Sequence, residues 1–449
     1  MKNNHISFSN VAGPTGTEAR RWRHLAVVAL IIAVSMLAPR LAQAAAGDLD
    51  SRFGNGGVVA TDFSQTDDYA FGIAVQPDGK IVVSGQSGIY PDLHSALARY
   101  TRNGRLDSTF GTGGKVVVTF DSSSDYLYAP VIQSDGKIVA AGSSRGTAFL
   151  VARFNADGSL EQTFGNNGSV ETTFGDPTAA AKAVVLQADG KIIVVGVSGA
   201  GSYSELNDFA LARYNPDGSL DQSFGTGGKV KTHFPGVFNT GSSATSVALQ
   251  PDGKLVVGGH YKNERTPHQF ALARYNPNGT LDSSFGQAGK VMTRMGLGDA
   301  FSFGIALQSN GGIVLAGYSD TTQNHDFSLA GYTSNGTLDS SFGTGGLVTT
   351  DFGGATDDIA YALTMQGDGK LVVAGRTGEY PALDFGLARY NSDGQLDQTF
   401  GTGGKMATNF SSSDQAYAVA LQSNGKIVLA GISFNGANFD FTVARYLGR

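Results

Sequence analysis

Hydrophobic and polar positions alternate along this chain in short runs separated by Gly-rich turns. The small, apolar run "YAVALQ" (417–422) is followed by an Asn-Gly turn and by the β-branched run "KIVLAG" (426–431). In another unit, "FALARY" (209–214) leads through the turn "NPDGSLD" to "GKVKTHF" (228–234). Short runs of this kind bounded by Asp-Gly or Asn-Gly predict antiparallel strands and hairpins. Each unit is therefore predicted to hold four strands, the first of which has small residues that suit a crowded position beside a central axis.

This four-strand unit recurs seven times, with a period of about 58 residues. The residue that ends the first strand is Gln76, Gln133, Gln187, Gln250, Gln308, Gln366 and Gln422. A second motif, Leu-Asp/Glu-x-x-Phe-Gly, ends at Gly54, Gly111, Gly165, Gly225, Gly286, Gly343 and Gly401. Repeats of four short antiparallel strands are typical of propeller blades. We expect residues 45–449 to form an all-β, seven-bladed β-propeller with four antiparallel strands per blade.

The two ends of the repeat array are out of phase with the unit. "GVVATDF" (57–63) is a fourth strand without the three before it, whereas the last unit stops after its third strand, "FTVARY" (441–446). The N-terminal strand is therefore predicted to complete the C-terminal blade and close the ring, which removes two exposed sheet edges.

A recurring charge pattern leads to the same prediction. An Arg of the third strand precedes an acid by eight residues in five units: Arg99/Asp107, Arg153/Glu161, Arg213/Asp221, Arg274/Asp282 and Arg389/Asp397. Gly331 replaces this Arg in one unit. Arg445 has no such acid after it and Asp50 has no such Arg before it, so the two are predicted to pair across the closure. The planar guanidinium suits this role because it can grip a carboxylate at two points.

The recurring motifs "ALARYNPDGSLDxxFG", "GGKVxTxF" and "AVALQPDGKIVVAG" together resemble the delta-60 repeat family of bacterial exported proteins. The resemblance covers nearly all of residues 47–446. It implies a β-propeller without a general activity assigned to the repeat, so it supplies no catalytic residues.

The first 44 residues have the features of an export signal. Arg20, Arg21 and Arg23 precede a 14-residue apolar run (25–38), and "AQA" (42–44) offers small residues for cleavage. The run is shorter than the ~20 residues of a membrane-spanning helix. We therefore expect an exported protein, periplasmic or secreted, without membrane insertion after cleavage; an uncleaved membrane anchor is the alternative.

Charge and cysteine content exclude several classes of function. The chain has a net charge of −6, of which residues 1–44 carry +4, so the remainder carries −10. An acidic surface of this kind argues against nucleic acid or anionic lipid as a partner. The absence of cysteine excludes disulfides, zinc–thiolate sites and a thiol nucleophile.

The loops that vary in length lie between the second and third strands and between the fourth and first. Both kinds leave the same face of an up-and-down blade, and loops on a rigid scaffold commonly bind ligands. The candidate ligand-binding residues on this face are Tyr90, Tyr380, Lys262, Glu264, Arg265 and His268. Neutral variation in loop length is the alternative. His260 and His268 are expected to be a solvated surface pair.

A ring of acidic residues near the channel mouth is a candidate metal site. Four of its members lie eight residues before the strand-ending Gln and one lies nine before: Asp68, Asp125, Asp358, Asp414 and Asp299. Carboxylates around an axis could hold calcium, the one cofactor considered. The favoured alternative is that each Asp accepts hydrogen bonds from backbone amides of its own loop.

These patterns favour a monomeric binding or interaction scaffold whose partner is an unknown protein or glycan. The alternative is a hydrolase or lyase acting on an extracellular polymer or a small metabolite. An enzyme needs a unique cluster of titratable groups near the axis, whereas the strongly placed polar residues recur in several units. No catalytic residue is therefore assigned.

Overall fold

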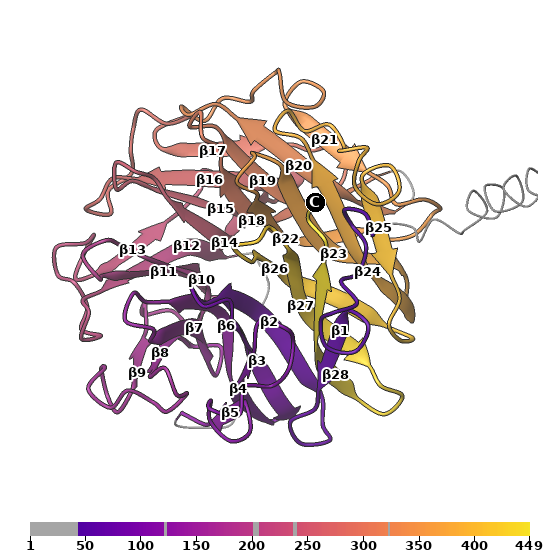
Figure 1. The fold of residues 1–449 in the computed structure, drawn as a ribbon. Helices are drawn as coiled ribbons and strands as arrows, with labels where there is room; N and C mark the ends of the chain where they lie inside the picture. Colours follow the sequence, from indigo (N-terminus) through magenta and orange to yellow (C-terminus); the bar gives the residue numbers. More distant parts are fainter. Residues whose placement is uncertain (1–43, 121–123, 201–205, 237–239, 322–323) are drawn as a thin grey trace, which may run out of the picture. The chain divides into compact units, whose positions relative to one another are not determined.

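The computed structural model describes residues 44–449 apart from 121–123, 201–205, 237–239 and 322–323. Apart from Ala44, the predicted export signal lies outside these residues. The compact unit from Ala45 to Arg449 consists of seven four-stranded antiparallel sheets, which are the blades of a β-propeller (Figure 1). None of the described residues belongs to a helix that could span a membrane.

Blades 1 to 6 take four consecutive strands each, from β2–β5 to β22–β25, and blade 7 consists of β26, β27, β28 and β1. The innermost strands are β2 (Asp68–Val75), β6 (Asp125–Ile132), β10 (Thr178–Leu186), β14 (Gly241–Leu249), β18 (Ala300–Leu307), β22 (Ile359–Met365) and β26 (Asp414–Leu421). The second strands are β3 (Ile81–Ile89), β7 (Ile138–Ser144), β11 (Ile192–Gly199), β15 (Leu255–Asn263), β19 (Ile313–Asp320), β23 (Leu371–Glu379) and β27 (Ile427–Phe434).

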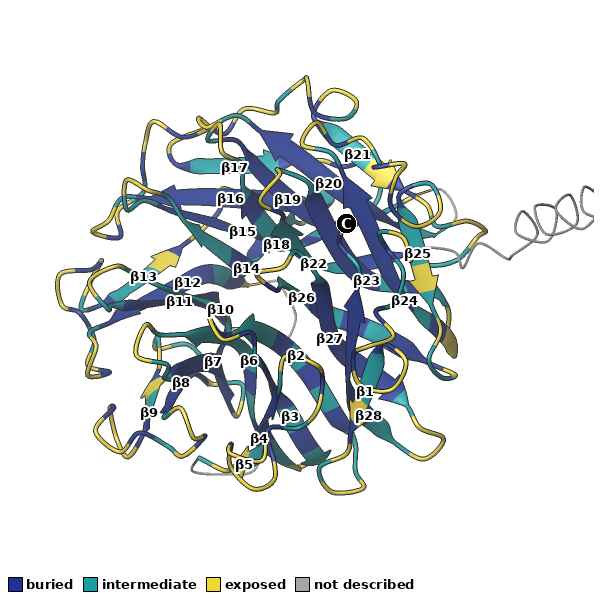
Figure 2. Ribbon diagram, viewed as in Figure 1, coloured by how far each residue is buried: buried dark blue, intermediate teal, exposed yellow. Residues whose placement is uncertain are grey.

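The two outer positions complete each sheet. The third strands are β4 (Asp92–Tyr100), β8 (Ala148–Phe154), β12 (Asn207–Tyr214), β16 (Thr266–Tyr275), β20 (His325–Tyr332), β24 (Ala382–Tyr390) and β28 (Phe439–Tyr446). The outermost strands are β1 (Val58–Thr61), β5 (Lys115–Val118), β9 (Ser169–Thr172), β13 (Lys229–Thr232), β17 (Lys290–Thr293), β21 (Leu347–Thr350) and β25 (Lys405–Thr408). The second and third strands are buried almost throughout, whereas exposed residues concentrate in the turns and at the outer edges (Figure 2).

The predicted ring closure is confirmed. β1 pairs antiparallel with β28, with Val58 opposite Ala444 and Thr61 opposite Phe441. Arg445 is 1 % exposed and its Nη2 lies 2.7 Å from Oδ2 of Asp50, as the charge pattern predicted.

The same arginine contact recurs between successive blades. In blade 3, Arg213 pairs with Asp221 at 2.7 Å, covers the ring of Phe224 at 4.6 Å and donates a hydrogen bond to the backbone carbonyl of Pro277 in blade 4. Blade 5 has Gly331 in place of the arginine, and Phe342 packs directly against it: Cγ of Phe342 lies 2.4 Å from the point that a Cβ at Gly331 would occupy. The pattern therefore joins each sheet to the next, except where a ring fills the space.

Candidate binding site in the central channel

The seven innermost strands each carry one irregularity in their pairing, five residues before the strand-ending Gln. At this position the register between the first and second strands shifts by one residue, which is a β-bulge. Bulges turn a side chain away from the regular pleat and are common next to functional sites. The residues at the bulges are Phe71, Tyr128, Lys182, Thr245, Phe303, Tyr361 and Tyr417, one from each blade. We call these seven residues the channel ring.

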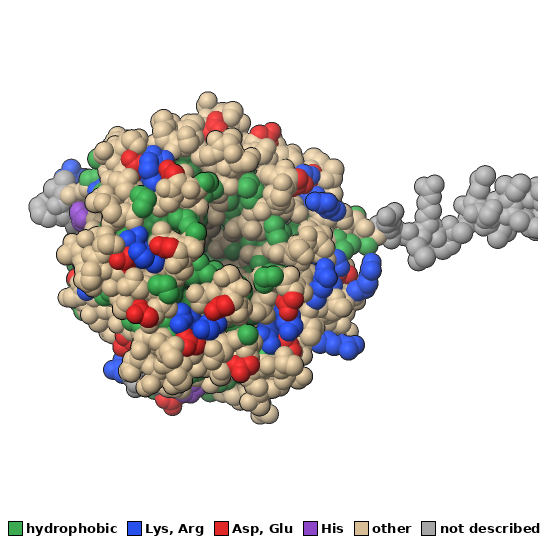
Figure 3. All heavy atoms as spheres, turned by 60° about the vertical axis from the view of Figure 1, so that its left-hand side comes forward, with side chains coloured by type: hydrophobic (Ala, Val, Ile, Leu, Met, Phe, Trp, Pro, Cys, Tyr) green, Lys and Arg blue, Asp and Glu red, His purple; other side chains and the backbone are tan. Residues whose placement is uncertain are grey.

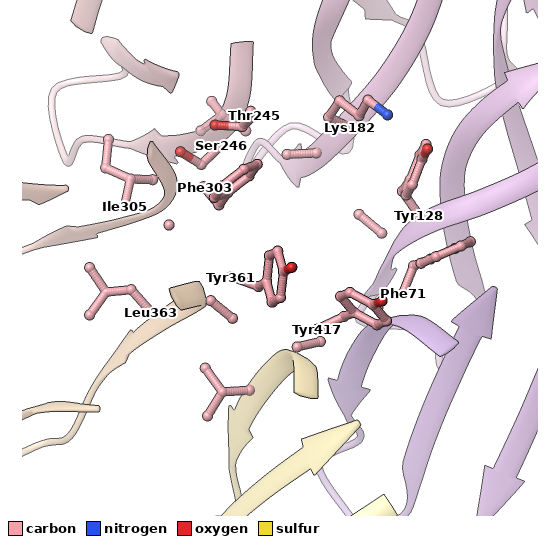
Figure 4. A pocket seen from close by; sticks show the side chains of 18 of the residues that line it. Phe71, Tyr128, Lys182, Thr245, Ser246, Phe303, Ile305, Tyr361, Leu363 and Tyr417 are labelled. Carbon is pink, nitrogen blue, oxygen red and sulfur yellow. The ribbon is translucent and has the colours of Figure 1, made fainter. Parts of the chain in front are cut away.

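The channel ring lines a cavity of about 460 Å³ at the centre of the propeller (Figure 4). Apolar side chains two residues further along the strands, such as Ile305 and Leu363, continue its wall. The space-filling view shows a hollow with hydrophobic side chains in its walls (Figure 3). The volume lies within the range of about 300–1,000 Å³ that is typical of small-molecule sites.

Five aromatic members of the ring form a continuous arc. The ring centroid of Phe71 lies 5.0 Å from that of Tyr128 and 5.9 Å from that of Tyr417. Tyr361 continues the arc, 5.0 Å from Tyr417 and 5.7 Å from Phe303. Tyrosine combines an apolar face with a polar hydroxyl, so the arc offers stacking surfaces for a ligand with its own ring faces.

Lys182 and Thr245 close the ring on the remaining side. The ammonium group of Lys182 lies 3.7 Å from the centroid of the Tyr128 ring, a cation–π contact. Burial lowers the pKa of Lys182 to about 8, so the ammonium is mostly protonated at neutral pH. Burial, with the charges of His268 and Lys182, lowers the pKa of His260 to about 3. Among the described residues that line the cavity, Lys182 is therefore the one side chain charged at pH 7.

Comparison with known proteins identifies the repeat. The family described as "Domain of unknown function (DUF5122) beta-propeller" matches residues 76–110, 133–164, 187–224, 250–285, 308–342, 366–400 and 422–447. The chain belongs to this DUF5122 β-propeller family. The matches fall once in each of the seven predicted units, and the delta-60 name remains a resemblance. The chain has no match among the curated proteins.

Several solved structures share the propeller fold at low identity. A catalytically inactive virginiamycin B lyase from Staphylococcus aureus, solved with quinupristin, is 12 % identical with a TM-score of 0.50, covering 86 % of this chain and 98 % of that one. The polysaccharide lyase Uly1 is 12 % identical with a TM-score of 0.50, covering 92 % and 94 %. An ulvan lyase of family PL25 is 11 % identical with a TM-score of 0.51, covering 87 % and 96 %. At this identity the similarity shows the fold alone.

The predicted ligand-binding residues lie in the hairpins between second and third strands and do not line the cavity. Tyr90 and Tyr380 are 79 % and 81 % exposed at the tips of the β3–β4 and β23–β24 hairpins. Lys262, Glu264 and Arg265 lie in or beside the β15–β16 turn of blade 4. These positions belong to three different blades, and none of them lines the cavity.

The two histidines of the β15–β16 hairpin do meet, but they are not solvated. His260 and His268 are 8 % and 7 % exposed, with ring centroids 5.8 Å apart. His268 packs against Phe301 at 4.2 Å and its backbone N–H donates to Asp299. The expectation of a surface pair is wrong because both side chains turn inward onto the aromatic side chains of β18.

The five predicted metal-ligating aspartates have backbone or histidine partners. Four are buried, and each accepts a hydrogen bond from the backbone N–H of the Phe that follows the preceding outermost strand: Asp68 from Phe63 (2.7 Å), Asp125 from Phe120 (3.2 Å), Asp358 from Phe352 (2.7 Å) and Asp414 from Phe410 (2.6 Å). Asp299 accepts from His268. These contacts match the alternative of backbone capping. No group of mutually close metal ligands in the described residues unites the five, although Asp68 and Asp358 each belong to a smaller group.

The channel ring was not predicted from the sequence. The small residues of the first strand, such as Ala70 and Ala416, are buried in the hydrophobic cores between neighbouring blades, and large side chains line the channel instead. The sequence nevertheless contains a signal for the channel ring. Five residues before each strand-ending Gln, the seven units place Phe, Tyr, Lys, Thr, Phe, Tyr and Tyr, a bulky and variable position among small ones.

Proposed function

We propose that this protein is an exported β-propeller binding protein that takes a small anionic ligand with ring faces, such as an acidic oligosaccharide, into its central channel. The observation that carries the proposal is the channel ring, in which an arc of five aromatic side chains faces one lysine. The proposed export rests on the basic, apolar and small-residue segments of residues 1–44.

The chemistry of the cavity supports this ligand class. Aromatic faces favour the apolar faces of sugar rings, and tyrosine hydroxyls can bond to their hydroxyl groups. A single ammonium without a carboxylate among the lining residues favours an anion. Because Lys182 is largely surrounded by protein, its attraction for a carboxylate or sulfate is screened less than that of a surface lysine.

A second candidate function is a lyase. Lys182 has a pKa of about 8, near the pH at which a general base works best, and it lies against Tyr128. In a β-elimination, the neutral amine would remove the proton next to a substrate carboxylate, a carbon–carbon double bond would form, and the departing oxygen would take a proton.

The test is direct titration of the purified protein with a panel of acidic and neutral oligosaccharides by calorimetry. We expect binding of an acidic member, weakened about tenfold to a hundredfold by Lys182→Met because a hydrogen bond to a charged group is lost. Tyr361→Ala should also weaken the binding of this oligosaccharide. Lys262→Met is the matched control, because it removes a lysine near the end of β15 that does not line the cavity.

The pattern of outcomes distinguishes the candidate functions. Equal affinity of wild type and Lys182→Met, with loss in Lys262→Met, would place the site on the variable loops and contradict the channel proposal. New ultraviolet absorbance from a carbon–carbon double bond, abolished by Lys182→Met, would make the protein a lyase. Binding without any such absorbance supports a binding protein.

A further inference from the structure

Two groups of three aspartates occupy equivalent places, one between blades 7 and 1 and the other between blades 5 and 6. The first group consists of Asp440 on β28, Asp62 just after β1 and Asp68 at the start of β2. The second consists of Asp326 on β20, Asp351 just after β21 and Asp358 just before β22. In each group, one oxygen from each carboxylate lies within 4.8 Å of the others. We call them the closure trio and the blade 5 trio.

In other blades, the equivalent positions hold a carboxylate and a side chain that hydrogen-bonds to it. At the places equivalent to Asp440 and Asp62, blade 3 has Asp208 and His233, whose Oδ1 and Nδ1 lie 3.0 Å apart. In blade 6, Asn409 donates a hydrogen bond of 2.7 Å to Asp384. In blades 5 and 7 the donor is replaced by a second acid, so two carboxylates face each other and a third is buried beside them.

The trios contain buried oxygens that no protein group satisfies. Asp326 and Asp440 are 7 % and 6 % exposed, and the Oδ1 atom of each has no hydrogen-bond partner among the described residues. A buried polar atom without a protein partner calls for an explanation, and a bound water or ion is one that fits a cluster of carboxylates. Both orphaned atoms belong to the same repeat position, and that position is the one at which the carboxylates meet.

The carboxylates of the trios form no salt bridge with the described Lys, Arg and His side chains. None of the ion pairs in the described part of the chain involves any of the six carboxylates. Lys115 and Lys405 donate hydrogen bonds to the backbone carbonyls of Asp62 and Asp351. The same bond recurs from Lys229 in a blade without a trio, so it is part of the repeat and not a response to the acids.

We propose that each trio binds one calcium ion. Three carboxylates without nitrogen or sulfur ligands suit a hard cation. A span of up to 4.8 Å is twice a calcium–oxygen distance of about 2.4 Å, whereas magnesium needs a tighter octahedron at about 2.0–2.1 Å. Asp62 and Asp351 are exposed, which leaves a path for the ion and room for water to complete its coordination.

The closure trio gives one of these ions a specific structural role. Its three aspartates come from the N-terminal strand, the C-terminal strand and the first inner strand, so an ion there would join both ends of the propeller to blade 1. The proposal is independent of the ligand in the central channel, because no member of either trio lines the cavity.

Calorimetric titration of the chelator-treated, purified protein with calcium chloride tests the proposal. We expect two ions per chain and a rise in Tm at about 10 mM calcium, on the order of 100 times the Kd of an extracellular calcium module. The same concentration of magnesium should raise Tm by less. Absence of calcium binding and of any calcium-dependent Tm in the wild type would overturn the proposal.

Matched variants locate the ions. Asp326→Asn and Asp440→Asn should each reduce the stoichiometry from two to one and the calcium-dependent rise in Tm by about half. Asp384→Asn, at the same repeat position in blade 6, should leave both unchanged. Each variant's Tm in chelator verifies its fold. Two ions retained in the Asp326→Asn/Asp440→Asn double variant would place the calcium elsewhere and contradict the assignment.

Discussion

Removing Arg445 tests whether the N-terminal strand closes the ring as described. The guanidinium binds Asp50 at 2.7 Å, donates to Oε1 of Gln422 at 3.2 Å and covers the ring of Phe53 at 4.6 Å. Arg445→Ala leaves the buried Asp50 with Lys426 as its remaining cation. Breaking a buried pair by removing one partner costs about 3–5 kcal/mol, and the remaining lysine favours the lower end of that range.

The expected loss of about 3 kcal/mol can be converted into a shift in Tm. Unfolding entropy is about 2.1 cal/mol/K per residue, so for a domain of roughly 400 residues Tm should fall by about 3–4 °C. Differential scanning calorimetry measures this shift. Arg213→Ala is the matched control, because Arg213 makes the same ion pair, ring contact and carbonyl contact in the middle of the array.

The two variants should differ in where the structure opens. Arg445→Ala should speed amide hydrogen exchange in β1 and β28, whereas Arg213→Ala should leave exchange in β1 unchanged. The reasoning is refuted if Arg445→Ala leaves Tm unchanged while Arg213→Ala lowers it. It also fails if the double variant Arg445→Ala/Asp50→Ala shows no coupling between the two sites.

Three further predictions concern the repeat itself. Tyr390→Phe should lower the free energy of unfolding by about 1 kcal/mol in urea titrations, because it leaves the hydroxyl of Thr350, 2.9 Å away, without its partner. Gly331→Ala should cost about 1–3 kcal/mol by the same assay, since its Cβ would lie 2.4 Å from a phenylalanine ring, while Gly367→Ala, with nothing within 4 Å, should cost much less. A threonine hydroxyl and the arginine partner lower the pKa of Glu161 from 4.5 to about 2, so its stabilisation is complete above pH 4.5 and is lost as the pH falls toward 2; Glu161→Gln should flatten the acid limb of a Tm–pH profile.

The propeller and its closure followed from the sequence because they are encoded by recurrence. Seven copies of one pattern define the unit, and the unpaired strand at 57–63 and the unpaired Arg445 and Asp50 show how the ends meet. Such predictions need only the spacing of the repeated motifs and the number of their copies, and both can be read directly from the sequence.

The channel ring and the trios depend on geometry that the pattern conceals. A bulge changes the face on which a strand's side chains lie, so the alternation of "YAVALQ" does not reveal that Tyr417 points into the channel. The trios combine residues on or directly beside three strands of two blades, and Asp62 and Asp440 are far apart in the sequence. The sequence pattern places Asp68 and Asp358 in one ring because they share a repeat position. In the structure, each lies instead beside two aspartates of the preceding blade.

Lys182 offers a test that separates a binding role from a structural one. Its folded-state pKa of about 8 lies below the ordinary value of 10.5, so the folded state binds its proton less tightly than the unfolded state does. The charge therefore destabilises the fold below pH 8, and the penalty disappears as the pH rises from 8 toward 10.5. Lys182→Met should raise the free energy of unfolding at pH 7 by on the order of 1–3 kcal/mol, and this gain should shrink above pH 8.

A residue that weakens the fold and is nevertheless placed in the wall of a cavity is expected where function needs it. The protonated form of Lys182 that lowers stability is the form that should bind an anionic ligand. Affinity should therefore be strong below pH 8 and should be lost as Lys182 deprotonates above it. Urea unfolding of wild type and Lys182→Met at pH 7 and pH 10 measures the first trend, and calorimetric titration of the acidic oligosaccharide over that range measures the second. If Lys182→Met is less stable than wild type at pH 7, the lysine holds the channel together, and the binding role assigned to it is wrong.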